Sequence, residues 1–171
     1  MNEKSNSNNK KKFNALRIAR ISLFTALSVI GSFINLNLFI STIAFDSSPG
    51  FFAALYFGVI DGVLITGLGH IVTAVINGFP LGPLHFVIAL GMALAGGAMG
   101  LINKTNKKWG FIPAALAAVA INTALSMVMV PELGWATTLS LVTVPLLLAA
   151  SLNAVVAAVI YIGVRSRRIR P

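Results

Sequence analysis

The 171-residue sequence has no cysteine and few charged residues, and both absences narrow the class of protein. Without cysteine, the chain has neither a disulfide framework nor a thiolate metal site. Charged residues make up 10% of this chain, whereas an ordinary soluble domain carries roughly 25%. Hydrophobic residues make up 57%, too many for a protein of this size to cover its surface with polar groups in water. The composition therefore indicates an integral membrane protein with a single domain.

Acidic residues are scarce as well, with four Asp and Glu against 13 Lys and Arg. A basic balance can indicate nucleic-acid binding, but that function needs a basic face on a folded surface. Here the basic residues fall in three short clusters between apolar runs, which is typical of membrane topology. We therefore expect no nucleic-acid partner.

Catalytic motifs are also missing. The sequence has no glycine-rich loop ending in Gly-Lys-Ser/Thr, so the chain does not itself use ATP by that route, and it has no His-Glu-x-x-His pair. It has no strained nucleophile turn either. His70 and His85 are 15 residues apart, a weak indication of a metal site, and we expect neither a metal nor a cofactor. A small intramembrane enzyme that uses these two histidines on a lipid-like substrate remains an alternative.

Apolar runs separated by turn signals predict an all-α bundle of six transmembrane helices. We expect helices at 14–40, 84–102, 111–130 and 138–164, and two short helices within 51–76. The break between the short helices is predicted at Asp61-Gly62, a turn signal. The apolar run from Ile21 to Ala44 is too long for the core of a signal peptide, so the first helix is retained.

The basic clusters predict the orientation of the helices. With six helices, all 13 Lys and Arg residues fall on one side, in the N-terminal region, at 104–108 and at the C-terminus. The positive-inside rule makes this side cytoplasmic, so both termini are cytoplasmic. We expect a multi-pass protein of the cell membrane. Residues 1–13 and 166–171 are predicted to be basic cytoplasmic tails, the first of them disordered, and 14–165 the transmembrane domain.

Strongly polar residues inside apolar helices are candidates for function because they are costly in lipid. The plain alternative is an interhelical hydrogen bond, typically worth about 0.6 kcal/mol. For the aromatic residues of the outer loops, the alternative is an anchor at the membrane interface. Asn153 is also polar and mid-helix, and an interhelical hydrogen bond suffices for it. The expected ligand-contacting residues are His70, Asn77, Phe79, His85, Met92, Asn122 and Trp135.

Small residues recur along one face of the first helix, at Ala15, Ala19, Ser22 and Ala26. Spacings of four, three and four place them in a flat stripe that suits close helix contact. The stripe either packs within the chain or docks against another membrane subunit.

The chain resembles the substrate-binding S components of energy-coupling factor vitamin transporters over about residues 15–165. The resemblance is carried by the helix-1 stripe, the loop-to-helix stretch at 46–51, the glycine turn at 58–62, and the Gly-His and Gly-Phe-Pro-Leu…His segments within 69–85. The last segments are similar to the group assigned to cobalamin precursors of the α-ribazole type. In the family the small-residue motif has alanine at both ends, whereas here Ser22 takes the first position.

The resemblance implies a six-helix protein that binds a vitamin or precursor near its outer face. It would deliver the ligand through a shared transmembrane subunit and two ATPase subunits. Pantothenate and riboflavin are alternative ligands, and an accessory subunit of another membrane complex is an alternative function. The outer side lacks a cluster of Lys or Arg, so a multiply phosphorylated ligand is not expected.

Overall fold

The computed structural model describes residues 3–34, 45–106 and 108–168, with side chains from 14 to 167 within these ranges. The described chain is helical throughout and contains no β-strand. Its elements are α1 (Glu3–Ser32), α2 (Ser48–Tyr56), α3 (Val59–Ile76), α4 (Leu84–Asn103), α5 (Phe111–Ala124), η1 (Leu125–Met129), α6 (Val130–Leu133), α7 (Trp135–Thr137), η2 (Thr138–Thr143) and α8 (Val144–Arg168).

Five stretches of the described chain are long and apolar enough to cross a membrane. They are Asn14–Ser32, Val59–Ile76, Leu84–Asn103, Phe111–Leu133 and Trp135–Arg167. Many large apolar side chains on these helices face outward, as expected when the surrounding solvent is lipid. They include Leu23, Ile30, Leu68, Leu90, Leu94, Leu116, Val155 and Val159.

The short helix α2 lies at the centre of the bundle, where α1, α3, α4, α5 and α8 pack against it. Phe51 and Leu55 of α2 are almost fully buried. The facing helices contribute mostly small residues, such as Ala95, Ala118 and Ala157, which let the backbones approach closely. With nine residues, α2 is too short to cross a hydrocarbon core of roughly 30 Å by itself.

The break between the second and third helices lies at Phe57-Gly58 and not at Asp61-Gly62 as the sequence predicted. Gly58 has a φ of 106°, a backbone conformation that glycine adopts without steric cost. Gly62 lies instead within the first turn of α3, where a Cβ would come within 2.7 Å of the Gly96 carbonyl oxygen. This glycine therefore serves the contact between α3 and α4.

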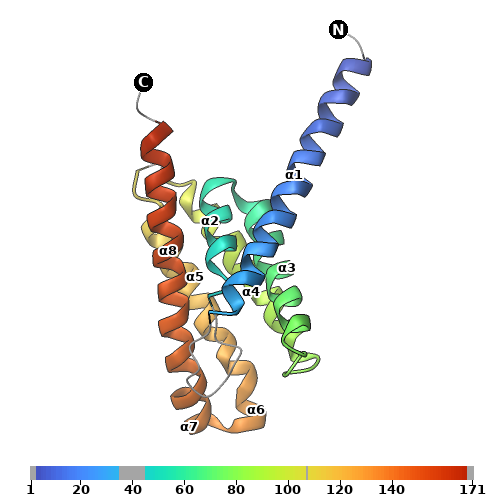
Figure 1. Ribbon diagram of the computed structural model, residues 1–171. Coiled ribbons are helices and arrows are strands. Elements are labelled where there is room, and N and C mark those ends of the chain that lie inside the picture. The colour runs from blue at the N-terminus through green and yellow to red at the C-terminus, as the bar shows by residue number, and fades with distance from the viewer. Residues whose placement is uncertain (1–2, 35–44, 107, 169–171) are drawn as a thin grey trace.

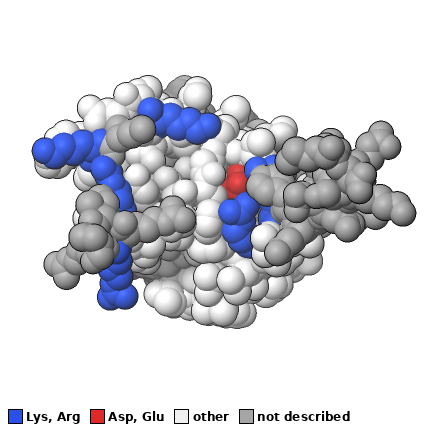
Figure 2. Space-filling model, turned by 90° about the horizontal axis from the view of Figure 1, so that it is seen from above, with Lys and Arg blue, Asp and Glu red and all other residues white. Residues whose placement is uncertain are grey.

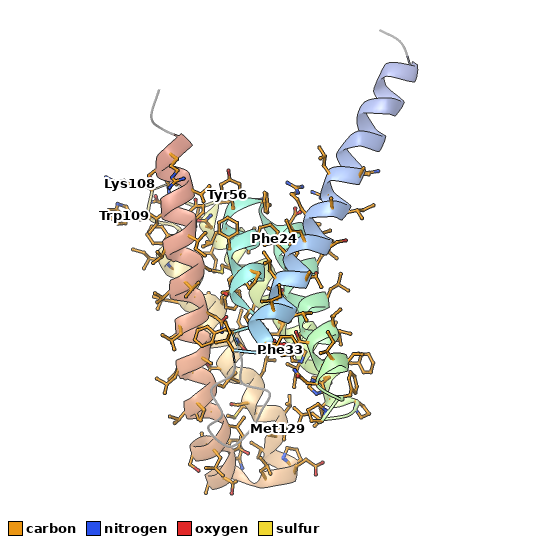
Figure 3. The ribbon with its side chains drawn as sticks, viewed as in Figure 1. Phe24, Phe33, Tyr56, Lys108, Trp109 and Met129 are labelled. Atoms are coloured by element: carbon orange, nitrogen blue, oxygen red, sulfur yellow. The ribbon has the colours of Figure 1, made fainter. Side chains whose placement is uncertain are left out.

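The start of α1 and the end of α8 lie at the same end of the bundle (Figure 1). The α4–α5 connection lies there too, since Arg165 Nη1 of α8 donates to the Lys108 carbonyl oxygen (3.4 Å). Figure 3 shows Lys108 and Trp109 beside the last turns of α8, with Met129 towards the opposite end. We call this the basic end, because it carries all the described Lys and Arg side chains. They are Arg17, Arg20, Lys104, Lys108, Arg165 and Arg167.

The helix α1 begins at Glu3, so it extends into the stretch predicted as a tail. The later part of the first predicted helix, 35–40, lies outside the described residues. The inward face of α1 packs on the bundle through Phe24, whose ring centroid lies 5.6 Å from those of both Phe52 and Phe57. Ser28 lies on the same face, against Gly69 of α3.

Candidate ligand-binding cavity

A cavity lies between α3, α4, η1 and α8, in the half of the bundle away from the basic end. His85 in the first turn of α4 lines it, whereas Lys104 follows the last turn of that helix at the basic end. The space between the lining side chains, taken together with the solvent at its opening, has a volume of about 650 Å³.

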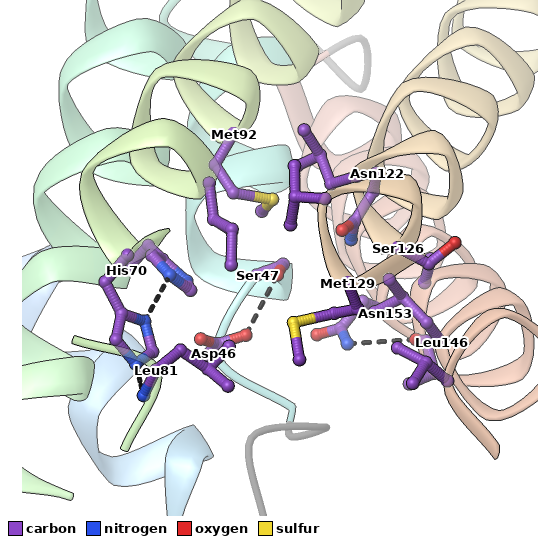
Figure 4. Close-up of a pocket in the computed structure, with 17 residues that line it drawn as sticks. Asp46, Ser47, His70, Leu81, Met92, Asn122, Ser126, Met129, Leu146 and Asn153 are labelled. Carbon is purple, nitrogen blue, oxygen red and sulfur yellow. Dashed lines mark hydrogen bonds between the residues drawn. The ribbon is translucent and has the colours of Figure 1, made fainter. Parts of the chain in front are cut away.

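The cavity has apolar walls and a few polar groups, which is the usual make-up of a small-molecule site. Figure 4 shows its polar side chains converging from several segments of the chain. The apolar lining comes from Leu81, Ile88, Met92, Leu125, Val128, Met129, Val142, Leu146, Ala149 and Ala150. The polar lining comes from Asp46, Ser47, His70, His85, Asn122, Ser126 and Asn153. No Lys or Arg of the described part of the chain lines it.

Four of the seven residues expected to contact ligand line this cavity, namely His70, His85, Met92 and Asn122. Asn77 lines a smaller adjoining space together with Asp46 and both histidines. Phe79 lies outside the cavity, but its ring centroid is 4.9 Å from that of His85. Trp135 is 66% exposed and does not line the cavity, so the structure does not bring it to the other six.

The two histidines contact each other directly. His70 Nε2 and His85 Nδ1 are 3.1 Å apart, and the Leu81 backbone N–H donates to His85 Nε2 (3.2 Å). The side chain of His85 is buried, with 1% of the residue exposed. Both ring nitrogens of His85 are thus engaged within the protein, whereas His70 uses one of its two.

The α3–α4 loop that carries Leu81 has an unusual backbone. Gly78 and Gly82 have positive φ angles, and so does Phe79, with a φ of 55° that is uncommon for a residue with a side chain. The Phe79 N–H donates to the Ala74 carbonyl oxygen (2.7 Å), which anchors this conformation to the end of α3. Pro80 and Pro83 fix two further backbone angles. The loop therefore holds the Leu81 amide towards His85.

Asn122 of α5 is 6% exposed, and its side-chain amide makes no hydrogen bond to another described residue. The amide atoms are accessible from the cavity and are not enclosed by protein, and a polar group in such a place normally has a water or ligand partner. The amide lines the cavity, so a bound molecule could supply that partner (Figure 4).

Asp46, Ser47 and Asn153 line the cavity and were not among the predicted ligand contacts. The Ser47 hydroxyl donates to Asp46 Oδ1 (2.9 Å), and burial raises the pKa of Asp46 from 3.8 to about 6. The sequence placed Asp46 in an outer loop. The sequence does contain one indication of its importance, because Asp46 is the single acidic residue between the first two predicted helices.

Asn153 ties α2 to α8 and thereby shapes the cavity. Its Oδ1 accepts from the Ser48 backbone N–H at the start of α2 (2.8 Å), and its Nδ2 donates to the Ala149 carbonyl oxygen (2.9 Å). The first N–H groups of a helix have no partner within that helix, so this amide satisfies one of them. The geometry agrees with the interhelical hydrogen bond expected for Asn153.

Two irregular helical segments face each other at the cavity. The segment η1 is a 3₁₀ helix and η2 is a π-helix, and Ser126 Oγ of one lies 2.8 Å from Thr143 Oγ1 of the other. Pro145 follows η2 and has no backbone N–H, which disturbs the regular hydrogen-bond ladder before it. Irregular turns of this kind are frequent at functional sites.

The small-residue stripe lies on the outer face of α1. Its members are Ala15, Ala19, Ser22 and Ala26, all of them exposed. The opposite face of α1 carries the contacts to α2 and α3 through Phe24 and Ser28. The stripe is therefore exposed in the described chain and faces away from α2 and α3.

An ion-pair cluster joins α1 to α3 at the basic end. Arg17 Nε lies 3.7 Å from Asp61 Oδ2, and Arg20 Nη2 lies 3.5 Å from Asp61 Oδ1. The Arg20 guanidinium also lies 4.5 Å from the centre of the Phe57 ring. Figure 2 views this end and shows Lys and Arg around its edge, with an acidic side chain among them.

One family model matches the chain over residues 16–165, and its description is "ECF transporter, substrate-specific component". The matched range contains all the residues that line the cavity, and it includes three of the four stripe residues. No curated protein and no solved structure matches the chain.

Proposed function

Because the chain belongs to the ECF transporter substrate-specific components, we propose that it captures a neutral, ring-containing vitamin or vitamin precursor from outside the cell. As a member of this family it is a transporter subunit and not an enzyme, and it works with a shared transmembrane and ATPase module. The alternative of an intramembrane enzyme built on His70 and His85 is therefore set aside. The best candidate ligand is α-ribazole.

The polarity of the cavity carries this proposal. Its described lining consists of apolar side chains, a carboxyl group, neutral amides, two hydroxyls and imidazoles, without Lys or Arg. A phosphorylated ligand would lack the basic partners that phosphates require. Pantothenate would bring its own carboxylate towards Asp46, and two like charges repel in a medium of low dielectric constant. A neutral ligand fits better, which leaves α-ribazole first and riboflavin second.

The size and chemistry of α-ribazole suit the cavity walls. Its dimethylbenzimidazole ring can stack among apolar side chains such as Met92, Leu125 and Leu146, and its ribose hydroxyls can reach Asp46 and Asn122. The cavity walls can also adjust to a ligand of this size. Met92 and Met129 are suited to this because methionine is unbranched and flexible.

For the topology, the proposal is a multi-pass protein of the cell membrane with six crossings and with the basic end in the cytoplasm. The second crossing lies between α1 and α3 and includes α2. Both the N-terminal cluster and the 104–108 cluster then lie on the cytoplasmic side, as the positive-inside rule requires. The cavity lies in the outer half of the membrane.

The exposed stripe of α1 is proposed as the docking surface for the shared transmembrane subunit. Small residues allow two helix backbones to approach, and van der Waals packing drives such contacts in lipid. The stripe residues are all exposed in the described chain, so their surface is available to a partner.

Isothermal titration of the purified chain tests the ligand assignment. We expect α-ribazole to bind, its 5′-phosphate and pantothenate to bind at least tenfold more weakly, and riboflavin to lie between them. The Leu94→Ala variant is a control, since Leu94 is 68% exposed on the lipid-facing side of α4. Tightest binding of the phosphate or of pantothenate would contradict the polarity argument.

A further inference from the structure

The His70–His85 pair forms a directed chain of hydrogen bonds, because one end of the chain is a backbone amide that can only donate. Leu81 N–H donates to His85 Nε2, so this nitrogen has a free lone pair and the ring proton of His85 is on Nδ1. The contact between His85 Nδ1 and His70 Nε2 (3.1 Å) then has His85 as its donor. His70 Nε2 accepts, which leaves the ring proton of His70 on Nδ1.

His70 Nδ1–H is the free end of this chain. No described residue accepts a hydrogen bond from it, and His70 lines both the cavity and the smaller space beside it. A second ring nitrogen of a metal-free histidine usually finds a partner when the residue is largely buried. The partner is missing on the side of the molecule where the ligand is expected.

We infer that His85 is a positioning residue that fixes His70 as a hydrogen-bond donor, so that the ligand must present an acceptor, such as a ring nitrogen or a carbonyl oxygen, to His70 Nδ1. The inference rests on the proposed function and deepens it by assigning the direction of one ligand contact. The direction originates in the α3–α4 loop, whose positive φ angles at Gly78, Phe79 and Gly82 set the Leu81 amide in place.

The opposite polarity holds at Asp46. Its carboxylate only accepts when ionised, so it requires a donor on the ligand. The cavity thus requires a hydrogen-bond acceptor of the ligand at His70 and a hydrogen-bond donor of the ligand at Asp46. In α-ribazole the unsubstituted nitrogen of the benzimidazole ring is such an acceptor, and the ribose hydroxyls are donors.

The tautomers can be measured without any ligand. The full chain, labelled with ¹⁵N-histidine in lipid nanodiscs at pH 8, contains only two histidines, so its spectrum is simple. We expect both rings to be neutral and protonated on Nδ1. His85→Phe removes the donor to His70 Nε2, and His70 should then become a mixture of tautomers, whereas Leu94→Ala should leave its single tautomer. An Nε2–H tautomer of His70 in the unaltered chain, or no change in His85→Phe, would overturn the inference.

Binding of α-ribazole at pH 8 tests the direction of the ligand contact. His70→Asp places an acceptor near the Nδ1 position, and His70→Asn places an N–H there. We expect His70→Asp to lose at least tenfold more affinity than His70→Asn. Equal losses would contradict an essential donor.

An indole analogue, in which the ring nitrogen acceptor is replaced by C–H, supplies the second half of this test. It should bind the unaltered chain more weakly than α-ribazole and should lose much less affinity in His70→Asp. Equal losses for the two compounds would overturn the inference. If the unaltered chain does not bind α-ribazole at all, the proposed ligand is wrong, and the tautomers measured without ligand still decide the role of His85.

Discussion

Asn122 and Asn153 are the same residue type, both buried and both lining the cavity, yet their amides differ in their partners. The Asn153 amide holds the first turn of α2 through Ser48 N–H. The Asn122 amide makes no hydrogen bond to another described residue. At the scale of single residues, one amide serves the fold and the other is available to a ligand.

Leucine substitutions separate these roles, because leucine has a similar size and no polar group. Asn153→Leu leaves Ser48 N–H without its partner and should lower the free energy of unfolding by about 1–3 kcal/mol. Asn122→Leu should leave stability unchanged or raise it, and should weaken α-ribazole binding about tenfold, equal to about 1.4 kcal/mol. Denaturant unfolding in detergent and isothermal titration measure the two effects. A stability loss in Asn122→Leu as large as in Asn153→Leu would show that Asn122 is structural.

Asp46 should make ligand binding depend on pH. Burial raises its pKa to about 6, and a ligand hydroxyl donates a stronger hydrogen bond to the ionised form than to the protonated one. Affinity should therefore be about tenfold lower at pH 5 than at pH 7. The other titratable groups that face Asp46 are His70 of α3 and His85 of α4. The Asp46→Asn variant distinguishes the effect of Asp46 from that of the histidines. If Asp46 is responsible, isothermal titration of this variant should give a nearly constant affinity between pH 5 and pH 7. A pH dependence that persists in Asp46→Asn would assign it to the histidines.

The raised pKa of Asp46 also makes the free energy of unfolding depend on pH. The folded pKa of Asp46 lies above its unfolded value of 3.8, so the folded chain binds more protons between about pH 4 and pH 6. This residue's contribution to the free energy of unfolding therefore decreases as pH rises through that window.

The sequence could predict some site residues and not others, for a physical reason. His70, His85 and Asn122 are polar residues inside apolar helices, and their cost in lipid makes them visible without a structure. Asp46 precedes a helix, and its depth depends on how deep in the bundle α2 begins, which is a tertiary feature. Trp135 suits an interface and a ligand equally well, so its residue type alone could not place it.

Among the elements, α1 has two faces with separate contacts. One face packs on α2 and α3, and the other carries the small-residue stripe. Ala19→Trp should abolish uptake in cells because a large side chain holds two helices apart. Ligand binding to the isolated chain should be retained. Leu94→Trp, on an exposed position of α4, should leave uptake intact. Loss of ligand binding in Ala19→Trp would show that the stripe supports the cavity.

The contact between α1 and α3 depends on Asp61 at the basic end. Its side chain is 2% exposed, and the arginine side chains that pair with it are about a third exposed. Asp61→Asn should lower the free energy of unfolding by about 1–2 kcal/mol, less than for a fully buried pair because water reaches the arginines. Ligand affinity should not change, since the cavity lies in the other half of the bundle. Unaltered stability would show that Phe24 and its aromatic partners suffice to hold α1.

The sequence indicated the all-helical class better than the breaks and irregularities of the helices. Two short helices were expected within 51–76, but Gly58 and not Gly62 ends the first, because a sequence does not distinguish a turn glycine from a contact glycine. The 3₁₀ and π segments at the cavity were not expected either. Pro145 is a local cause for η2, whereas the contact of Ser126 with Thr143 exists only in the folded bundle.

For the whole molecule, the charge distribution and the helix lengths point to the same topology. The helix α2 leads towards the basic end. A Cβ added to Gly58, which follows α2, would lie 3.8 Å from the side chain of Lys104 at that end. The chain therefore returns to the basic end between α1 and α3. This path agrees with the proposed six crossings, of which the second is short, and a short crossing is tolerable where neighbouring helices surround it.

Cysteine labelling in whole cells tests this topology, and the absence of native cysteine gives it a clean background. Trp135 is 66% exposed at the end opposite the basic clusters, and Thr105 is exposed in the α4–α5 connection. If the basic end is cytoplasmic, a maleimide that cannot cross the membrane should modify Trp135→Cys in intact cells. It should modify Thr105→Cys only after the cells are permeabilised. Asn106 is the poorer position, because its Oδ1 accepts from the Lys108 and Trp109 backbone N–H groups and shapes that turn. Modification of Thr105→Cys in intact cells would contradict six crossings with a cytoplasmic basic end.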